Sequence, residues 1–248
     1  MEMSDARQVF AITGSDRLGF LQNLVTNDLR KAEGALVYAA LLTPQGKFIA
    51  DFFVHETGDM MLLDVSAALA PVLVPRLNMY RLRADVQIAP SPMVVSRGTG
   101  PAPVGALPDP RDARLGWRLY GPEDLSDATD WDALRVALLV PEAGIELTGD
   151  SYILEQGFER LHGVDFRKGC YVGQEVTARM KHKTELRKGL ARVEIHGDAA
   201  PGTPIMAGDR EAGTLLTRAG DQAIAYLRFD RAEGPMQAGD AVVTRLPD

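Results

Sequence analysis

The chain has 248 residues, of which 46% are apolar and 25% are charged, as in a soluble globular protein of one large domain or two. Its longest apolar runs, such as residues 60–63 and 136–140, are far too short to cross a membrane, because a spanning helix needs about 20 residues. The net charge of −7 argues against general nucleic-acid binding through bulk electrostatics.

The cysteine content and the N-terminal residues bear on the compartment. The single cysteine, Cys170, excludes a disulfide within the chain and fits a reducing environment. The first residues lack the basic-then-apolar layout of a secretion signal. We therefore expect a cytoplasmic protein with no membrane association. No apolar helix face demands a partner, so we also expect a monomer.

Short alternating runs predict strands through the first half of the chain. They are expected at residues 9–12, 37–42, 48–55, 60–65, 82–88, 94–96 and 117–120. The second and third of these form a hairpin around Pro44 and Gly46, which are typical turn residues. The segment 90–110 is rich in proline and glycine and is expected to be irregular around its short strand.

Three helices are expected between these strands. The first is capped by Ser15 or Asp16, and the second by Ser66. Pro71 and Pro75 predict that the second helix is bent or begins late. The third opens near Trp131. This mixture indicates an α+β fold rather than a doubly wound sheet, and no glycine-rich nucleotide loop is present.

Cys170 lies in the stretch that we consider most informative, residues 165–176. Gly169 and Gly173 bracket it, Arg167 and Lys168 precede it, and a helical pattern follows at Val176, Arg179, Met180 and Lys183. We predict a turn that leads into a helix, with Cys170 just before the first helical turn. There the helix dipole favours an anion, so the thiolate of Cys170 should form more readily than that of a free cysteine, whose pKa is about 8.5. Composition alone favours a buried, inert cysteine.

The string Lys168-Gly169-Cys170-Tyr171-Val172-Gly173-Gln174-Glu175 resembles the signature of the YgfZ-type folate-binding proteins, which are related to the aminomethyltransferase (T-protein) of the glycine cleavage system. A second matching pattern lies near the N-terminus, at Gly14, Asp16, residues 20–22 and residues 26–28. The resemblance implies an aminomethyltransferase-like fold and an accessory role in the maturation or repair of iron–sulfur proteins. One cysteine cannot supply the four ligands of a cluster, so any cluster must be shared with a partner.

The resemblance also implies a tetrahydrofolate site, with no metal site predicted. Trp131 would stack on the pterin, and Glu155 would accept two parallel N–H bonds from its edge. The candidate catalytic residues are Cys170 and Asp51. The further candidate cofactor-binding residues are Asn27, Arg179, Tyr171 and Lys168.

Two other functions remain open. The fold resemblance admits a tetrahydrofolate-dependent aminomethyltransferase, but Ala50-Asp51 stands where that family has two aspartates, and the chain is short. The sequence therefore leaves open whether any reaction is catalysed. The basic segment 167–188 admits a tRNA-modification helper that binds RNA, although its charge would equally suit a polyglutamylated folate tail, a phosphate or a solvated helix face.

The character of the sequence changes after Lys188. Short alternating runs with regular glycine turns predict a small β-barrel. We therefore divide the chain into an aminomethyltransferase-like α+β folate-binding region, residues 1–188, and a C-terminal β-barrel domain, residues 189–248.

Overall fold

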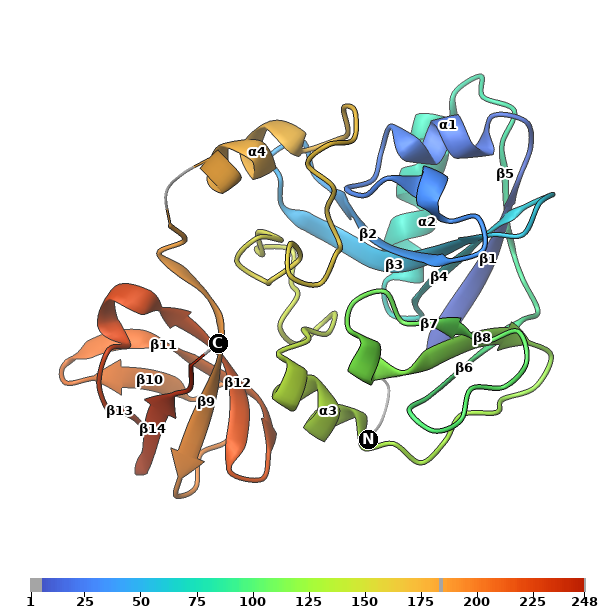
Figure 1. Ribbon diagram of the computed structural model, residues 1–248. Coiled ribbons are helices and arrows are strands. Elements are labelled where there is room, and N and C mark those ends of the chain that lie inside the picture. The colour runs from blue at the N-terminus through green and yellow to red at the C-terminus, as the bar shows by residue number, and fades with distance from the viewer. Residues whose placement is uncertain (1–5, 183–184, 248) are drawn as a thin grey trace.

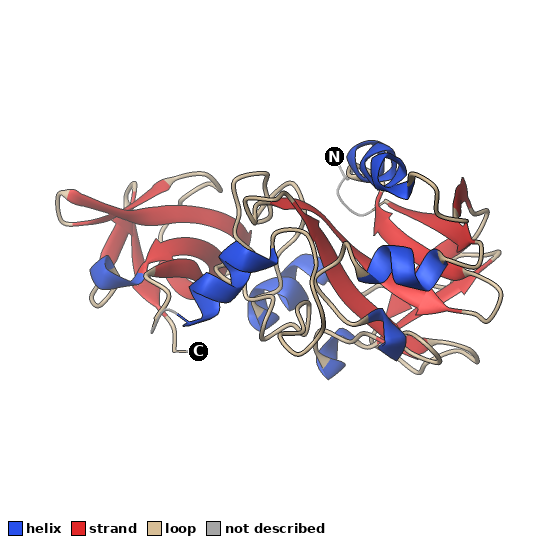
Figure 2. Ribbon diagram, turned by 90° about the horizontal axis from the view of Figure 1, so that it is seen from above, coloured by secondary structure: helices blue, strands red, loops and turns tan. Residues whose placement is uncertain are grey.

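The computed structural model describes residues 6–182 and 185–247. Lys183, which belongs to the helical pattern above, lies outside these residues. The chain forms an α+β region followed by a closed β-barrel, as predicted (Figure 1). The barrel and the five-stranded sheet of the first region lie at opposite ends of the molecule, with helices and long loops between them (Figure 2).

An antiparallel sheet with strand order β2-β3-β4-β1-β5 organises the first region. Its strands are β1 (Arg7–Thr13), β2 (Leu36–Leu42), β3 (Phe48–Glu56), β4 (Met61–Ser66) and β5 (Gln87–Pro90). Every residue of β2 is buried. Because side chains alternate along a strand, Val37 and Ala39 enter one hydrophobic core and Leu36 and Tyr38 enter another on the opposite face.

Helices α1 (Arg17–Gln22) and α2 (Ala70–Arg81) cover the first of these two faces (Figure 1). Between α1 and β2 lies the short helix η1 (Leu29–Lys31). Pro71 stands in the first turn of α2, where its missing N–H costs nothing, so the helix begins late as expected. Ser66 ends β4 and does not cap α2.

Besides the Ser66 cap, two local predictions are wrong. Asp16 precedes α1 but makes no side-chain cap, because its carboxylate accepts instead from the backbone N–H of Asp85 at 2.8 Å. The strand expected at residues 82–88 is confined to β5. Leu82 takes a left-handed φ of 44° at the end of α2, and the next residues form the turn that leads to β5.

A second, smaller sheet has strand order β6-β8-β7. Its strands are β6 (Val94–Gly98), β7 (Leu107–Pro108) and β8 (Trp117–Gly121), with helix η2 (Ala113–Leu115) between the last two. Helix α3 (Trp131–Leu138) follows, and it begins as a capped helix should, because Asp130 accepts from the N–H of Ala133 at 2.9 Å.

Helix α4 (Gln174–His182) connects the first region to the barrel, which closes in the order β10-β11-β12-β9-β14-β13. The strands are β9 (Lys188–His196), β10 (Pro204–Ala207), β11 (Arg210–Ala219), β12 (Gln222–Arg228), β13 (Met236–Ala238) and β14 (Ala241–Arg245), with helix η3 (Phe229–Arg231) after β12. Small and branched apolar side chains fill its interior. Within the described residues, every helix is too short or too polar to span a lipid bilayer.

Candidate functional site

The signature stretch is a loop anchored at its first residues by Lys168. This side chain is 6% exposed and donates to the carbonyl oxygens of Gln22 and Val25, at the end of α1, at 2.6 and 2.5 Å. Burial lowers the pKa of Lys168 to about 8. The ammonium group thus satisfies carbonyls that the short helix leaves unpaired, and it holds the loop against α1. The structure therefore gives Lys168 an anchoring role.

The last residues of the signature are held by close backbone packing. Gly173 has a φ of 84°, and a Cβ atom there would lie 2.6 Å from the carbonyl oxygen of Thr43 in the β2–β3 turn. Gly46 of the same turn has a φ of 76°, and a Cβ atom there would lie 2.8 Å from that of Val176. Both positions therefore require glycine. Tyr171, which is 8% exposed, is buried in the second core between these contacts.

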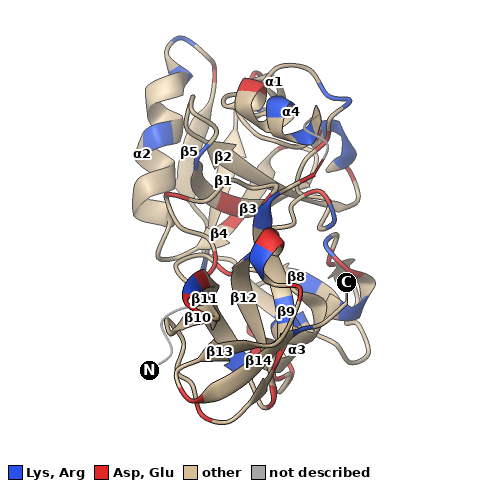
Figure 3. Ribbon diagram, turned by 90° about the vertical axis from the view of Figure 1, so that its left-hand side faces the viewer, with Lys and Arg blue, Asp and Glu red and all other residues tan. Residues whose placement is uncertain are grey.

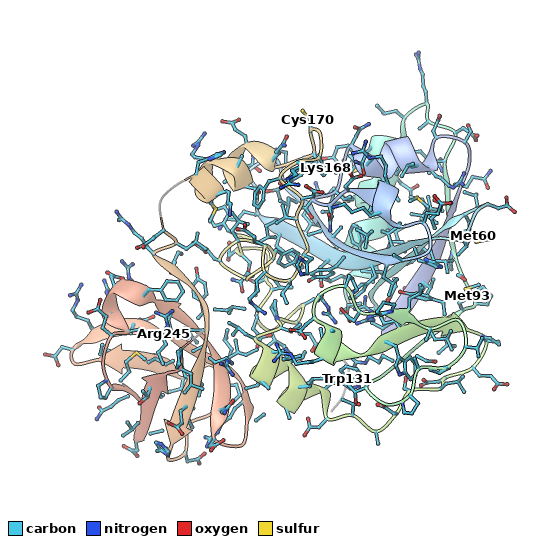
Figure 4. The ribbon with its side chains drawn as sticks, viewed as in Figure 1. Met60, Met93, Trp131, Lys168, Cys170 and Arg245 are labelled. Atoms are coloured by element: carbon cyan, nitrogen blue, oxygen red, sulfur yellow. The ribbon has the colours of Figure 1, made fainter. Side chains whose placement is uncertain are left out.

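Cys170 is exposed at the tip of this anchored loop (Figure 4). The buried position that composition favours for this cysteine is therefore wrong. The predicted position beside the helix N-terminus is also wrong, because three residues separate Cys170 from Gln174, where α4 begins. The signature thus consists of buried anchors that flank one accessible thiol.

Lysine and arginine residues lie along the loop and α4 (Figure 3). Part of this charge is compensated, since Arg179 pairs with Glu175 at 2.8 Å on the exposed face of α4 and Lys181 pairs with Glu159. Arg179 therefore makes a surface ion pair, which contributes little stability.

Asn27 has its side-chain amide fully engaged. Its Nδ2 donates to the carbonyl oxygens of Tyr38 and His162 at 2.8 and 2.6 Å, and its Oδ1 accepts from the N–H of Asp28 at 2.8 Å. The side chain joins β2 to the loop around residue 162. These three bonds leave the side chain little capacity to bind a ligand, so Asn27 has a structural role in holding these segments together.

Asp51 and Trp131 line one small cavity, which we call the central cavity. Its volume is about 40 Å³. Asp51 accepts from the hydroxyl of Tyr38 at 2.9 Å, and the guanidinium of Arg97 lies 4.0 Å from the ring centroid of Trp131. Other arginines complete the wall: Arg7, Arg111, Arg118 and Arg135. Small-molecule sites usually measure roughly 300–1,000 Å³, so a pterin does not fit here.

Two buried aspartates that the sequence analysis missed hold these arginines in place. Asp64 accepts from Arg7 at 2.6 Å and from Arg118 at 3.2 Å, and Asp109 accepts from Arg111 at 2.8 Å. Burial alone would raise the pKa of Asp109, but the attraction to Arg111 outweighs it and the pKa is about 2. Asp64 could have been found from the sequence, since it interrupts the otherwise apolar strand β4.

Glu155 lies elsewhere, at the junction between the first region and the barrel. It is 9% exposed, and its Oε2 accepts from the hydroxyl of Tyr226 in β12 at 2.7 Å. Burial, and then the bond to Glu155, raise the pKa of Tyr226, which keeps this donor protonated. Trp131 and Glu155 therefore line different cavities, so the structure does not bring these two candidate pterin contacts together.

Two pockets meet at Glu155, and both have the size of a ligand site. The first, which we call the apolar pocket after Leu138, Leu154, Leu190 and Phe229, has a volume of about 490 Å³. Its wall also contains Gln156 and three arginines, Arg114, Arg160 and Arg192. The basic pocket has a volume of about 660 Å³, and its wall includes His182, Glu185, Arg187, Lys188 and Arg228. Glu155 and Leu186 belong to both walls.

The apolar pocket also contains an unsatisfied polar atom. Gln156 is 3% exposed, and its Oε1 has no hydrogen-bond partner among the described residues. Buried polar atoms without partners are uncommon and call for a ligand or a water.

A metal ion needs several ligating side chains close together. In residues 6–182 and 185–247, no three His, Cys, Asp or Glu side chains are grouped closely enough to hold a metal ion.

Comparison with known proteins agrees with this arrangement. Residues 187–248 match the family model described as the CAF17 C-terminal β-barrel domain. The iron–sulfur cluster assembly factor IBA57, mitochondrial, of Mus musculus is 29% identical over 280 residues, covering 94% of this chain and 78% of the relative. The human protein of the same name is 28% identical, and the match covers 98% of this chain and 83% of that protein. The chain is similar to the IBA57 iron–sulfur cluster assembly factors. This confirms the resemblance to the YgfZ-type family.

A fungal relative is matched over a smaller part of its length. The IBA57 homologue of Mycosarcoma maydis, named mitochondrial, is 31% identical, and the match covers 80% of this chain but 57% of that protein. All three relatives are named as mitochondrial proteins. The expectation of a cytoplasmic protein is contradicted by these names, which point to a mitochondrial location.

A solved structure confirms the predicted fold. The glycine cleavage system aminomethyltransferase T from Bartonella henselae superposes with a TM-score of 0.74 and covers 98% of this chain and 83% of that chain. The two sequences are 12% identical, so the likeness concerns the fold alone.

Proposed function

We propose that this protein is an accessory factor for the maturation or repair of iron–sulfur proteins and that Cys170 is the residue through which it acts. The observation that carries the proposal is the accessible thiol of Cys170 at the tip of a loop anchored by Lys168 and Gly173. The names of the relatives support the same role.

The proposed chemistry is ligand sharing. A thiolate binds iron, and a cluster usually needs four such ligands, so Cys170 would supply one and the partner or client protein the rest. An exposed loop tip lets two proteins reach the same iron atom, which a buried cysteine would prevent. The cluster is cargo in this proposal and is not a resident cofactor.

The first test replaces Cys170 in cells that lack their own homologue. Cys170→Ser should abolish recovery of iron–sulfur enzyme activity, because an alcohol is a much poorer ligand for iron than a thiolate. The unfolding free energy should change by less than about 0.5 kcal/mol, since the side chain is exposed. Asp209→Asn, an exposed change in a barrel turn away from the signature, serves as the control. Full enzyme recovery with Cys170→Ser would overturn the proposal.

We propose further that the protein binds tetrahydrofolate at the junction and not in the central cavity. The apolar pocket has room for a pterin, and Gln156 supplies an unsatisfied acceptor there. Tyr226 occupies Oε2 of Glu155, whereas no described residue hydrogen-bonds its Oε1. Glu155 therefore retains acceptor capacity for the N–H groups of a pterin edge. Tetrahydrofolate, when bound, would carry one-carbon units.

Calorimetric titration with tetrahydrofolate tests this placement. Glu155→Gln should weaken binding by about 1–3 kcal/mol, because it replaces a charge-assisted acceptor with a neutral amide. Trp131→Ala should leave the affinity within about 0.5 kcal/mol, since Arg97 covers that ring. A loss of affinity with Trp131→Ala and none with Glu155→Gln would place folate in the central cavity instead. If the wild-type protein does not bind tetrahydrofolate, the folate proposal is wrong.

A further inference from the structure

An open groove lies beside the loop that carries Cys170, and we call it the loop groove. Its volume is about 560 Å³, and its lining includes the first residues of β2, Pro110 and most of the segment 162–167, which leads to the signature. Arg167 lines the groove three residues before Cys170, so their Cα atoms are at most about 11 Å apart. Among the described residues, the loop groove shares no lining side chain with the central cavity or the junction pockets.

Phe166 is the exposed aromatic side chain of this groove. It is 37% exposed, although phenylalanine is usually buried. The Nζ of Lys181 lies 5.3 Å from the centroid of its ring, and Lys181 is itself held by Glu159. The neighbouring backbone is fixed as well, because the N–H of Asp165 donates to the carbonyl oxygen of Thr26 at 3.0 Å. A ring held in this way loses little entropy on binding, so Phe166 is preorganised to contact an apolar group.

The two acids of the loop groove are already paired, and Arg167 is not. Glu159 pairs with Lys181, and Asp165 pairs with Lys31 at 2.6 Å. The backbone N–H of Arg167 donates to Asp165 at 2.7 Å, whereas its guanidinium group has no acidic partner in the part of the chain that the structure describes. A guanidinium group can donate two parallel N–H bonds to one carboxylate, so this end of the groove is complementary to an acid.

Ligand sharing at Cys170 requires a second protein to cover this region. Both proteins must reach the same cluster, so the partner's surface comes to lie over the residues beside the thiol. A specific interface buries roughly 800 Å² on each side, which one thiol cannot supply. The remaining contacts must come from neighbouring residues, and the hot spots of interfaces are enriched in aromatic and arginine side chains. Phe166 and Arg167 are of these two types and both line the loop groove.

We propose that the loop groove is the docking site for the protein that shares a cluster with Cys170, a proposal that rests on the function proposed above. The segment that enters the groove is both apolar and acidic: an apolar side chain packs on the ring of Phe166, and a carboxylate pairs with Arg167. A second copy of this chain is a poorer occupant, because a symmetric interface would place the basic segment 167–188 against itself.

The test measures the recovery of iron–sulfur enzyme activity at graded expression levels in cells that lack their own homologue. At low expression, Phe166→Ala and Arg167→Glu should each lower the recovery about five- to ten-fold, since each removes a hot-spot contact. High expression should restore the activity, because mass action overcomes weakened binding. Cys170→Ser should remain inactive at every level, because its defect lies in the ligand and not in docking.

Three controls separate docking from damage to the loop. Arg167→Lys keeps the positive charge and should retain most of the recovery. Arg210→Glu makes the same charge change at an exposed arginine of β11 and should have no effect. In the purified protein, Phe166→Ala should leave the rate at which iodoacetamide alkylates Cys170 within about two-fold of wild type, because the environment of the thiol is unchanged.

The outcomes that contradict the proposal are distinct. If Cys170→Ser abolishes recovery while Phe166→Ala and Arg167→Glu behave as wild type, the docking site is wrong and the proposed function stands. If Cys170→Ser recovers fully, both are wrong. If Phe166→Ala stays inactive at high expression or alters the alkylation rate, Phe166 supports the loop and docks no partner. A wild-type dimer in sedimentation velocity that Phe166→Ala dissociates would make a second copy the occupant and overturn the proposal.

Discussion

At the scale of single residues, the buried acids Asp64 and Asp109 explain why the central cavity is small. Each accepts from an arginine that would otherwise point into open space. Removing one member of a buried ion pair leaves the other charge unpaired, which costs about 3–5 kcal/mol. The network therefore keeps the cavity filled with protein side chains and leaves Asp51 with Tyr38 as its hydrogen-bond donor.

The pH dependence of stability should report on this network. Asp109 has a pKa of about 2 in the folded protein, against 3.8 ordinarily, so the unfolded chain binds more protons between these values. The stabilisation is complete above about pH 4 and is lost as the pH falls through 2. Asp109→Asn should therefore be destabilised by about 2 kcal/mol or more at pH 7, and the difference from wild type should shrink below pH 3.

Urea unfolding across this pH range measures the effect. The matched control is Asp240→Asn, an exposed aspartate in the barrel. A difference between wild type and Asp109→Asn that stays constant from pH 7 to pH 2 would contradict the assigned ion pair.

At the scale of elements, the signature loop depends on a turn more than 120 residues earlier. The β2–β3 turn supplies Gly46 and the carbonyl oxygen of Thr43, and the start of α4 supplies Gly173 and Val176. A side chain at either glycine would push the two segments apart. The β2–β3 hairpin therefore supports the loop that carries Cys170.

At the scale of the whole molecule, a buried polar cluster fixes the barrel to the first region. Glu146 accepts from the hydroxyl of Thr217 in β11 at 2.5 Å and from Arg135 in α3 at 3.2 Å. Apolar side chains from α3 and the barrel surround this cluster, among them Val136 and Ile224. Because the apolar and basic pockets lie at the same junction, their shape depends on this attachment.

A double-mutant cycle tests the attachment. Glu146→Gln should cost about 1–3 kcal/mol, since Arg135 loses a buried carboxylate but keeps its ion pairs with Asp132 and Glu142. Thr217→Val should cost about 1–2 kcal/mol. The two losses should not be additive, because the residues share a hydrogen bond. Thr244→Val, an exposed change in β14, is the control. Strictly additive losses would contradict the coupling, and urea unfolding supplies the free energies.

The sequence by itself determined the elements and the family. Alternation predicted β2, β3, β4, β6 and β8, and glycine punctuation predicted the barrel, because these patterns reflect local geometry and burial of one face. The eight-residue signature was enough to indicate the relationship to iron–sulfur assembly factors, because it combines an exposed cysteine with the glycine and the lysine that position its loop.

Tertiary structure alone decided which candidate residues share a site. Trp131 and Glu155 suit a pterin by chemistry, yet they line different cavities, because α3 separates the central cavity from the junction. Lys168 and Asn27 were candidate ligands, but their donors are engaged by carbonyl oxygens far away in the chain. Residue type shows what a side chain can bind, whereas packing between distant segments decides what it does bind.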